Sequence, residues 1–486
     1  MLFNSSVFLQ FFAAFLLLYH LCRHRLAARN ILILVASYVF YGWWDYRFLA
    51  LLFLTSLLDY VAAQRIEAAT TTARRRLWLG VSLTGNLGVL GFFKYFNFFV
   101  DSFVMLAHQL GFHAEPRTLG IILPVGISFY TFQSLSYSLD VYRGEIRATR
   151  NLLNFLAYVA FFPQLVAGPI ERARHLLPQF ESTRRITHGD LQEGLWLVLW
   201  GLFKKVVIAD NLAPLVELVY QHPTQSAPAV ILGTLAFAFQ IYGDFSGYTD
   251  IARGLARWLG FDLMVNFNLP YFAASPRDFW RRWHISLSTW LRDYLYISLG
   301  GNRHGPWRTR FNLMATMLLG GLWHGAAWHF VLWGGWHGLG LMATRKSPVA
   351  ANRRSPELGV SPEGSARRTP VRRHETLRRY AACAATFLFV LYGWLLFRAS
   401  SWEQVVTLTQ SLAHWTWPAW GWDYVWGLAA FVGPLLLIQT WQAQAGDLLA
   451  PAKAPRWLRA TLQAALLLAI VAFWEHQAAP FIYFQF

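Results

Sequence analysis

The residues FNLMATMLLGGLWHGAAWHFVLWGGWHGLGLMAT, at positions 311–344, decide the fold of this chain. These 34 positions carry no Asp, Glu, Lys or Arg, although an arginine stands at either end. A run of this kind suits a bilayer, whose ~30 Å hydrocarbon core a helix crosses in about 20 residues. The run also contains His324, His329 and His337. Because titratable side chains inside a membrane are rare and usually functional, it predicts a functional site as well as a membrane fold.

The composition of the whole chain also indicates a lipid bilayer. Of its 486 residues, 56% are hydrophobic, 17% aromatic and only 14% charged. Several apolar runs approach or reach the length of a spanning helix, and none alternates strictly as a barrel strand would. The sequence therefore predicts an all-α, polytopic membrane protein. The runs are Leu2–Cys22, Leu77–Phe93, Leu119–Leu139, Ala229–Tyr242, Ala381–Phe397 and Leu458–Phe473.

Basic residues outnumber acidic residues by 42 to 25, a formal net charge of +17. Such an excess can indicate nucleic-acid binding, but here the basic residues lie in short loops between apolar runs rather than on one soluble face. They cluster after every second run, which is the positive-inside pattern. We therefore expect no nucleic-acid partner, about ten full crossings and both termini outside the cytoplasm. The clusters are Arg23, Arg25 and Arg29; Arg65, Arg74, Arg75 and Arg76; and Arg143, Arg147 and Arg150.

Two apolar stretches have arginines on both flanks, so both ends of each are expected on the cytoplasmic side. Phe155–Ile170 contains two prolines and a glycine, and 311–344 has a glycine pair shortly before His324 and a glycine directly after it. Irregular backbone at membrane depth must be buried in protein or line a cavity. We predict that both stretches re-enter the membrane. His324 lies near the apex of the second, ~20 Å along a helix from its flank and close to mid-membrane.

Two further segments depart from simple crossings. Lys204 and Lys205 interrupt the apolar run Leu191–Tyr220, and the sequence leaves open whether they extend to the interface or line a wet cavity. Residues 346–376 are polar and rich in arginine, with almost no large apolar side chain. They predict a disordered, basic cytoplasmic loop. The remainder of residues 1–486 is predicted to form a single membrane domain.

Upstream of the histidine run, residues 275–298 predict an amphipathic helix. Ser275 and Pro276 suit its N-cap and first turn, and Asp278 is spaced to pair with the arginine four residues later. The segment has too many charges for a lipid-facing span and too many tryptophans for a free surface helix. We expect it to lie at the interface or to line a pocket. It carries a fourth histidine of interest, His284.

The histidines do not have the spacing of a metal site. His324 and His329 are five apart, about 140° around a helix, and no Asp or Glu lies between Asp293 and Glu357. No metal is therefore predicted. A neutral histidine buried in the membrane has a ring nitrogen that can accept a proton, so His324 is a candidate general base. His329 and His337 are interpreted as packing residues whose rings donate to backbone carbonyls.

Short motifs from about Ser37 to the end of the chain carry a resemblance to a known family. They are SYVFYGWW (37–44), PVGISFYTFQ (124–133), DVYRG (140–144), FPQLVAGPI (162–170), YGDFSGY (242–248), the helix predicted at 280–296, GLWHG (321–325) and FIYFQF (481–486). In this combination and order the chain resembles the membrane-bound O-acyltransferase (MBOAT) family. The resemblance is greatest to its bacterial branch, which includes the membrane subunits for alginate O-acetylation and teichoic-acid D-alanylation.

The resemblance implies a helical bundle around a tunnel, which acetyl-CoA enters from the cytoplasm and the acceptor from the other face. It implies that His324 is the catalytic histidine, which removes the proton of an acceptor hydroxyl or transiently carries the acyl group. It implies that His284 is the second site histidine, which orients a water, the acceptor or the thioester; its alternative role is a hydrogen-bond partner of the pocket wall. The function implied is O-acetylation of a cell-envelope or exported polysaccharide such as alginate, at the bacterial inner membrane.

In relatives of this branch the acyl group passes to a separate, extracytoplasmic hydrolase-like protein, so the resemblance also implies such a partner. Residues 481–486 resemble a tail implicated in that hand-over. Tyr483 is accordingly a candidate acyl relay, with an interfacial aromatic anchor as its alternative role. Asp244 is a carboxylate in an apolar run, and it is a candidate tunnel-lining residue or a helix cap at a break beside Gly243 and Gly247.

Two other functions are compatible with part of this pattern. A transporter or flippase without covalent chemistry would also have re-entrant segments and intramembrane histidines. It would be expected to show paired inverted repeats and a carboxylate relay, and the sequence shows neither. An MBOAT enzyme that acts on a lipid, sterol or peptide remains open, although the terminal motif favours a polysaccharide.

Overall fold

The computed structural model describes residues 1–113, 115, 118–222, 225–344, 373–474 and 481–482. Within these residues the chain is built from helices and contains no β-strand, which confirms the all-α prediction. Helices suit this composition because each satisfies its own backbone hydrogen bonds without water. Five helical segments are long and apolar enough to cross a membrane: 26–68, 72–109, 227–258, 376–398 and 421–445. Shorter apolar helices such as Ser6–Cys22 are not among these five, so the count of ten crossings stays a prediction.

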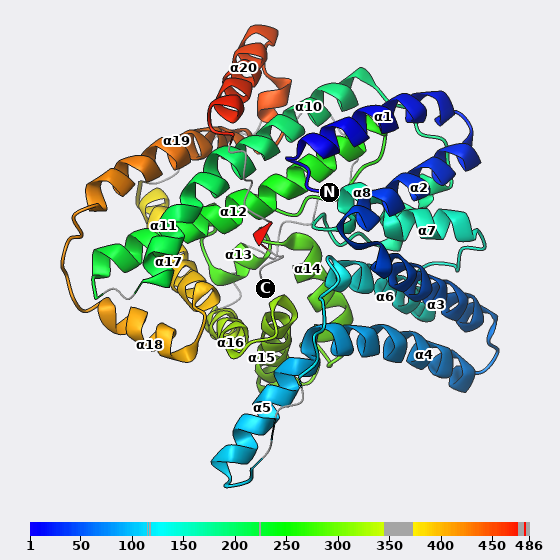
Figure 1. Ribbon diagram of the computed structural model, residues 1–486, viewed down its shortest axis with the longest axis horizontal. Helices are drawn as coiled ribbons and strands as arrows, with labels where there is room; N and C mark the ends of the chain where they lie inside the picture. The colour runs from blue at the N-terminus through cyan, green and yellow to red at the C-terminus, as the bar shows by residue number, and fades with distance from the viewer. Residues whose placement is uncertain (114, 116–117, 223–224, 345–372, 475–480, 483–486) are drawn as a thin grey trace.

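The helices follow one another along the chain as labelled in Figure 1. The helices around the site are described below with their bounds. The remaining helices are α1 (Ser6–Cys22), α2 (Leu26–Asp45), α3 (Leu49–Ala68), α7 (Leu152–Ala160), α8 (Phe162–Leu165), α9 (Ala173–Phe180), α18 (Trp402–Ser411), α19 (Gly421–Ala445) and α20 (Arg456–Ala472).

Helix α12 (Ala227–Trp258) forms the centre of the bundle (Figure 1). Helix α10 (His188–Leu202) lies along it at very short range, because glycines face one another across the contact. A Cβ atom built on Gly201 would be 2.5 Å from the carbonyl oxygen of Gly247, and one on Gly247 would be 2.7 Å from that of Gly201. Small residues of this kind let two helix backbones approach closely inside a membrane.

A π-helical segment, Phe203–Ala209, continues α10 into α11 (Asp210–Gln221) and carries Lys204 and Lys205. Both lysines are buried and paired with carboxylates, so they neither reach the interface nor stand in a wet cavity. Their Nζ–O distances are 2.6 Å for Lys204–Asp250, 2.7 Å for Lys205–Asp244 and 2.8 Å for Lys205–Asp210.

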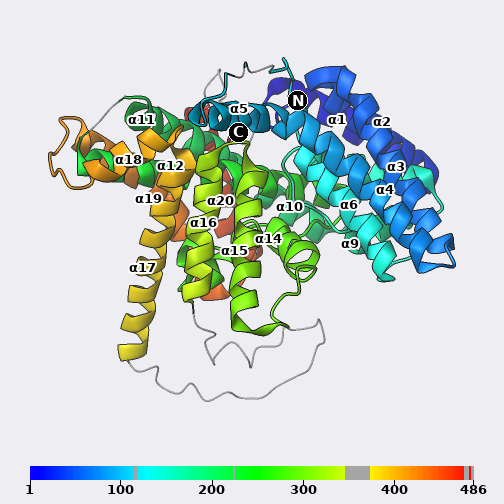
Figure 2. The same cartoon turned by 90° about the horizontal axis from the view of Figure 1, so that it is seen from below.

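Helices α15 (Gly305–His324) and α16 (Trp328–Ala343) form an antiparallel hairpin, with its turn beside α5 (Phe96–Gln109) in Figure 2. Glycines allow this contact too, since a Cβ atom on Gly321 would collide with the carbonyl of Phe330. The chain reversal predicted for residues 311–344 is confirmed, and His324 is the last residue before the turn. Its depth in the membrane stays a prediction.

Two other predicted segments are only partly borne out. In Phe155–Ile170 the backbone breaks at Phe161 between two short helices, and the whole stretch is buried in protein, as irregular backbone at membrane depth requires. Most of the predicted loop 346–376 lies outside the described residues. Its last residues, however, are helical, because α17 begins at Arg373 and runs to Arg398.

Candidate active site

His324 ends helix α15 and is enclosed by aromatic side chains. The helix stops there because Gly325 is extended, with φ −158°, and a side chain at that position would collide with the ring of Phe330. The His324 ring is 5.0 Å from Trp333 and 5.5 Å from Phe397, measured between centroids, and the side chain is 4% exposed. The ring is therefore fixed and shielded from bulk solvent.

His284 approaches His324 from another segment, with 6.4 Å between the two ring centroids. It precedes α14 (Ile285–Trp290) and has a left-handed backbone, φ 44° and ψ 54°. This conformation costs a non-glycine residue about 1–3 kcal/mol and persists where the surroundings impose it. Here Asn266 imposes it: its carbonyl accepts from the Ile285 N–H, and its Oδ1 accepts from the N–H and hydroxyl of Ser286.

The predicted continuous helix over 275–298 is wrong, and the break is where His284 stands. Ser275 and Pro276 do begin a helix, α13 (Pro276–Trp280), and the Asp278 side chain accepts from Arg282 at 3.0 Å. The chain then turns before α14 and a π-helical segment follow. The turn re-aims the His284 ring toward the bundle interior, where it lies 4.7 Å from Phe245.

His329 and His337 lie apart from this pair. His337 is buried, and its Nδ1 accepts a hydrogen bond from the Trp280 indole at 3.3 Å, so its partner is a side chain rather than the predicted carbonyl. His329 is half-buried and packs on Phe330 at 4.1 Å between centroids. Among the described residues no group of three or more His, Cys, Asp or Glu is arranged to hold a metal ion.

A cavity of about 160 Å³ opens beside His324. Its wall includes the ammonium-bearing side chain of Lys94, the side chain of Ser128 and the first residues of α6 (Ile127–Arg143). From the positive-inside pattern we expect this side to face away from the cytoplasm. The cavity is therefore the candidate acceptor side of the site. The complete lining is Trp44, Lys94, Leu123, Pro124, Val125, Gly126, Ile127, Ser128, Phe129, Trp323 and His324.

Lys94 is a site residue that the sequence analysis missed. It lies in a π-helical segment, Gly91–Tyr95, between α4 (Thr72–Leu90) and α5. Its Nζ donates to the carbonyls of Trp323 at 2.7 Å and His324 at 3.0 Å. The last carbonyls of a helix lack intrahelical partners and attract cations, so Lys94 caps α15 at its last residue. A lone cation within an apolar run was the available signal.

A second, larger hollow of about 570 Å³ is lined by Arg143, Arg174 and Arg292, by the carboxylates of Glu145 and Asp293, and by Tyr294. From the positive-inside pattern we expect this arginine pocket on the cytoplasmic side. Tyr294 donates to Asp140 at 2.6 Å, which orients its ring. A row of touching rings then leads inward to His324. Its successive centroid distances are 5.2 Å for Tyr294–Trp290, 3.8 Å for Trp290–Phe132, 5.5 Å for Phe132–Trp323 and 5.1 Å for Trp323–His324.

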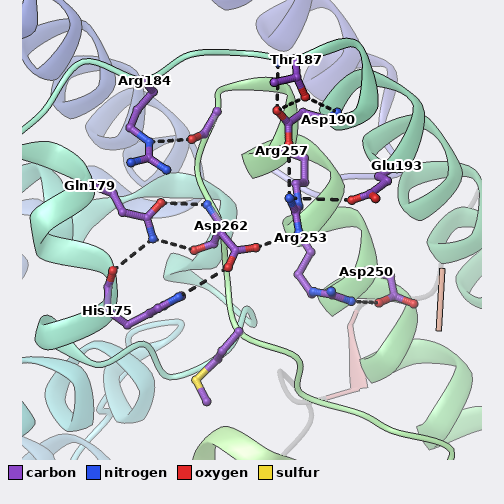
Figure 3. A network of polar contacts seen from close by, with 12 residues as sticks. His175, Gln179, Arg184, Thr187, Asp190, Glu193, Asp250, Arg253, Arg257 and Asp262 are labelled. Atoms are coloured by element: carbon purple, nitrogen blue, oxygen red, sulfur yellow. Dashed lines mark hydrogen bonds and ion pairs between the residues drawn. The ribbon is translucent and has the colours of Figure 1, made fainter. Parts of the chain in front are cut away.

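A polar network holds the chain segment that leads to Asn266 (Figure 3). Asp262 pairs with Arg257 at 3.0 Å and lies 3.5 Å from the His175 ring. The Gln179 amide donates to the carbonyl of Asp262 and accepts from its N–H, both at 2.9 Å. The network fixes residue 262, four positions before Asn266, so it supports the contact that holds His284.

The two remaining predicted residues have different outcomes. Tyr483 lies outside the described residues. Asp244 is buried in the middle of α12, which runs without interruption through this position, so the interpretation as a helix cap is wrong. Gly243 and Gly247 serve close packing instead: a Cβ atom on Gly243 would be 2.8 Å from the carbonyl of Lys204.

Comparison with known proteins agrees with this architecture. The family described as MBOAT, membrane-bound O-acyltransferase family, matches residues 145–347, which include His284 and His324. A probable alginate O-acetylase AlgI of Azotobacter vinelandii is 47% identical over 406 residues, covering 82% of this chain and 76% of the relative. The chain therefore belongs to the membrane-bound O-acyltransferase family, and it is a membrane-embedded O-acyltransferase.

Two further relatives show the range of acceptors in the family. A peptidoglycan O-acetyltransferase of Helicobacter pylori is 35% identical over 407 residues, which cover 78% of this chain and 73% of the relative. A teichoic acid D-alanyltransferase of Streptococcus thermophilus is 25% identical over 288 residues, which cover 55% and 69%. Their names share transfer to cell-envelope polymers.

We expect Lys94→Met to lower the kcat of acyl transfer by about 10²-fold, since a 1 Å displacement of a reacting group has an effect of this size. Methionine keeps the length of the side chain but leaves the carbonyls of Trp323 and His324 uncapped. Lys94→Arg should retain more activity because it preserves the charge and the donors. Steady-state kinetics on the purified protein measure both, and equal loss in the two variants would argue against a capping role.

Hydrogen bonds to Asp262 and Glu171 raise the pKa of His175 to about 10, against ~6.5 in an unfolded chain. The folded protein thus binds more protons between those pH values. The contribution of His175 to the free energy of unfolding is full below pH ~6.5 and is lost as the pH rises through ~10. We expect His175→Gln to flatten this decline. Thermal unfolding in detergent at about pH 6, 8 and 10 measures it, and an unchanged slope would contradict it.

Proposed function

We propose that the protein transfers an acetyl group from acetyl-CoA, bound on the cytoplasmic side, to an acceptor on the other side, for O-acetylation of a cell-envelope polysaccharide. One observation carries the proposal. His324 stands in the wall of the outer cavity and at the inner end of the row of rings that begins at the arginine pocket. In this proposal the thioester approaches His324 from the side of these rings and the acceptor approaches it through the cavity.

The donor side has the chemistry that CoA requires. CoA carries several phosphate groups, and guanidinium groups bind phosphate through paired, charge-assisted hydrogen bonds. Three guanidinium groups, those of Arg143, Arg174 and Arg292, line one hollow of about 570 Å³. Glu145 and Asp293 lie in the same wall and pair with two of them, at 3.4 Å for Arg174–Glu145 and 2.6 Å for Arg292–Asp293, so in this proposal the phosphates of CoA replace these carboxylates as partners. Ligand pockets usually occupy about 300–1,000 Å³, so this hollow is large enough for the nucleotide end of the donor.

The proposed reaction is a direct acyl transfer. A ring nitrogen of His324 takes the proton of the acceptor hydroxyl as its oxygen attacks the carbonyl carbon of the thioester. The new C–O bond forms a tetrahedral intermediate. The C–S bond then breaks, and the CoA thiolate takes the proton back from His324 as it leaves. In the alternative course the His324 ring nitrogen attacks the thioester carbonyl, the C–S bond breaks and CoA leaves as the thiolate. The acceptor hydroxyl then attacks the acetyl-imidazole, the C–N bond breaks, and the ring nitrogen takes the proton of the hydroxyl.

His284 is proposed to orient the reacting groups. Its ring is 6.4 Å from that of His324, measured between centroids, which is too far for a direct hydrogen bond, and in this proposal a water or a substrate oxygen bridges them. The imposed backbone of His284 keeps its ring in place without the substrate. An orienting group that is fixed in advance does not have to be ordered during the reaction.

The size of the outer cavity bears on the acceptor. At about 160 Å³ it is well below the usual size of a ligand pocket, so it suits an acetyl group and a single hydroxyl-bearing group better than a polymer chain. This favours an intermediate carrier between His324 and the polysaccharide. We propose that an extracytoplasmic hydrolase-like partner receives the acetyl group and modifies the polymer, as the motifs of this branch imply.

The same proposal fixes the orientation in the cell. The protein is embedded in a membrane, and we place it in the bacterial inner membrane with the arginine pocket inside. Both termini would then lie on the extracytoplasmic side, where the polysaccharide acceptor and the partner protein are found.

We expect His324→Ala to lower the release of CoA from labelled acetyl-CoA by about 10²–10⁴-fold, the usual contribution of a general acid–base group. His329→Ala is the matched control, because His329 lies in the same hairpin but packs outside the histidine pair. It should stay within about twofold of the native protein if general acid–base catalysis rests on His324 alone. Equal turnover in the native protein and His324→Ala would overturn the proposed chemistry.

The fate of the label separates the possible acceptors. Acetate that appears in the polysaccharide fraction of cells, and that disappears on deletion of the gene, supports the proposed acceptor. Acetate in the lipid fraction would instead identify an enzyme that acts on lipid. Transport of an intact molecule without release of CoA would indicate a transporter.

We expect the double variant Arg174→Ala/Arg292→Ala to raise the KM for acetyl-CoA by about tenfold or more, since hydrogen bonds to charged groups are the stronger ones. The value of kcat should change little because neither side chain reaches His324. Arg456→Ala, an exposed arginine on α20, is the control for lost positive charge. A changed kcat with an unchanged KM would contradict the assignment of the arginine pocket.

A further inference from the structure

Two residues near the C-terminus, Phe481 and Ile482, are buried inside the bundle, and they are the described part of what is called the C-terminal segment below. Phe481 and Ile482 are 1% and 4% exposed. In Figure 1 this short red piece lies beside α12, near the middle of the molecule rather than at its rim. The Ile482 N–H donates to a carboxylate oxygen of Asp244 at 2.6 Å, across 238 positions of sequence. A backbone group is thus bound by a buried carboxylate of the central helix.

Asp244 is held for this contact by a buried ion cluster. Its other carboxylate oxygen is 2.7 Å from the Lys205 ammonium, which also pairs with Asp210 at 2.8 Å. All three side chains are less than a tenth exposed. A buried charge needs a partner and hydrogen bonds to offset its desolvation. The ion pair with Lys205 stabilises the carboxylate, and the carboxylate in turn accepts a charge-assisted hydrogen bond from the Ile482 N–H.

A second ion pair nearby, between Lys204 and Asp250, provides a comparison for the contact between Asp244 and Ile482. Asp250 lies on the same helix and pairs with Lys204 at 2.6 Å. Its other oxygen is 3.3 Å from Arg253, on its own helix. Both ion pairs connect the segment Phe203–Ala209 to α12, and the partners of Asp250, Lys204 and Arg253, lie within these two segments. Asp250 is therefore a built-in control for Asp244.

One aromatic ring, that of Phe245, lies between the docked segment and His284. The Phe481 ring is 4.9 Å from Tyr248 and 5.9 Å from Phe245, measured between centroids. Phe245 is in turn 4.7 Å from His284. Phe481 thus supports the wall on which His284 rests. A segment that leaves this place would remove packing from behind His284.

We propose that Asp244 is a positioning residue that docks the C-terminal segment behind His284, so that this segment forms part of the active-site wall. The proposal rests on the proposed function only for its effect on catalysis. The docking itself is independent of the reaction, so a failure of either can be told from a failure of the other.

The substitution Asp244→Asn tests the docking, because a carboxylate can accept from two sides and an amide from only one. Lys205 and the Ile482 N–H both need an acceptor, and the cation attracts the amide oxygen more strongly. The amide NH₂ then faces another donor, and the segment is released. Asp250→Asn is the matched control. Ile482→Pro removes the N–H from the other side and leaves the ion cluster intact, so the proposal remains testable if Asp244→Asn does not fold.

Docking is measured by the rate at which a polar maleimide modifies Ile482→Cys in nanodiscs, with Cys22 and Cys383 replaced by serine. The aspartate substitutions are made in the Ile482→Cys protein. We expect slow modification of the introduced cysteine in the Ile482→Cys protein alone and when Asp250→Asn is added. When Asp244→Asn is added, we expect modification to be at least about tenfold faster. Equal rates in the two aspartate variants, or rapid modification without any aspartate change, would overturn the docking.

The catalytic effect is measured on the same aspartate variants and on Ile482→Pro. We expect Asp244→Asn and Ile482→Pro to lower the kcat of CoA release by about tenfold while the KM for acetyl-CoA is unchanged, because the donor pocket is untouched. Asp250→Asn should stay within about twofold of the native protein, because it leaves the docked segment in place. Loss of labelling protection with an unchanged kcat would overturn the positioning role. A native protein that releases no CoA would count against the proposed function and leave the labelling result standing.

Discussion

Every polar group inside a bilayer must find its partner within the protein, and the structure depends on this constraint. The last carbonyls of α15 have no partner in their own helix, so Lys94 crosses from a neighbouring segment to bind them. Lys204 and Lys205 are held by carboxylates on α12 and α11. At the break before α14, Asn266 replaces the helical hydrogen bonds that are missing. Each solution joins segments that are distant in sequence, and together they place the two histidines.

The site is accordingly rigid before any substrate binds. His324 is fixed by the end of its helix and His284 by an imposed backbone turn, and both rings are enclosed by aromatic side chains. Holding this geometry lowers the stability of the folded protein, but the reacting groups are then already in position when the substrate binds. The polar network around Asp262 extends this support from the site to the partly exposed side chains of Asp262 and His175. The strained backbone of His284 is thus stabilised by contacts that extend through Asn266 to the network around Asp262.

The sequence predicted the helical fold and the chain reversal at His324, because uncharged length, flanking arginines and glycine placement are local signals. The N-cap at Ser275 was predicted for the same reason. The continuous helix through His284 was wrong because the break is imposed by Asn266, a tertiary contact that leaves no trace in helical periodicity. At Asp244 the glycines were interpreted as a break, whereas they provide close packing of two helices. Lys94 carried a signal that was not used.

The glycine contact between α10 and α12 has a consequence for the evolution of the chain. Gly201 and Gly247 each occupy the space that a side chain on the other helix would need. Neither position can gain even a methyl group unless the backbones separate, and separation would pull Lys205 away from Asp244. No single substitution therefore leads to a different packing of these helices. We therefore expect the relative position of α10 and α12 to stay the same as the sequence changes one residue at a time.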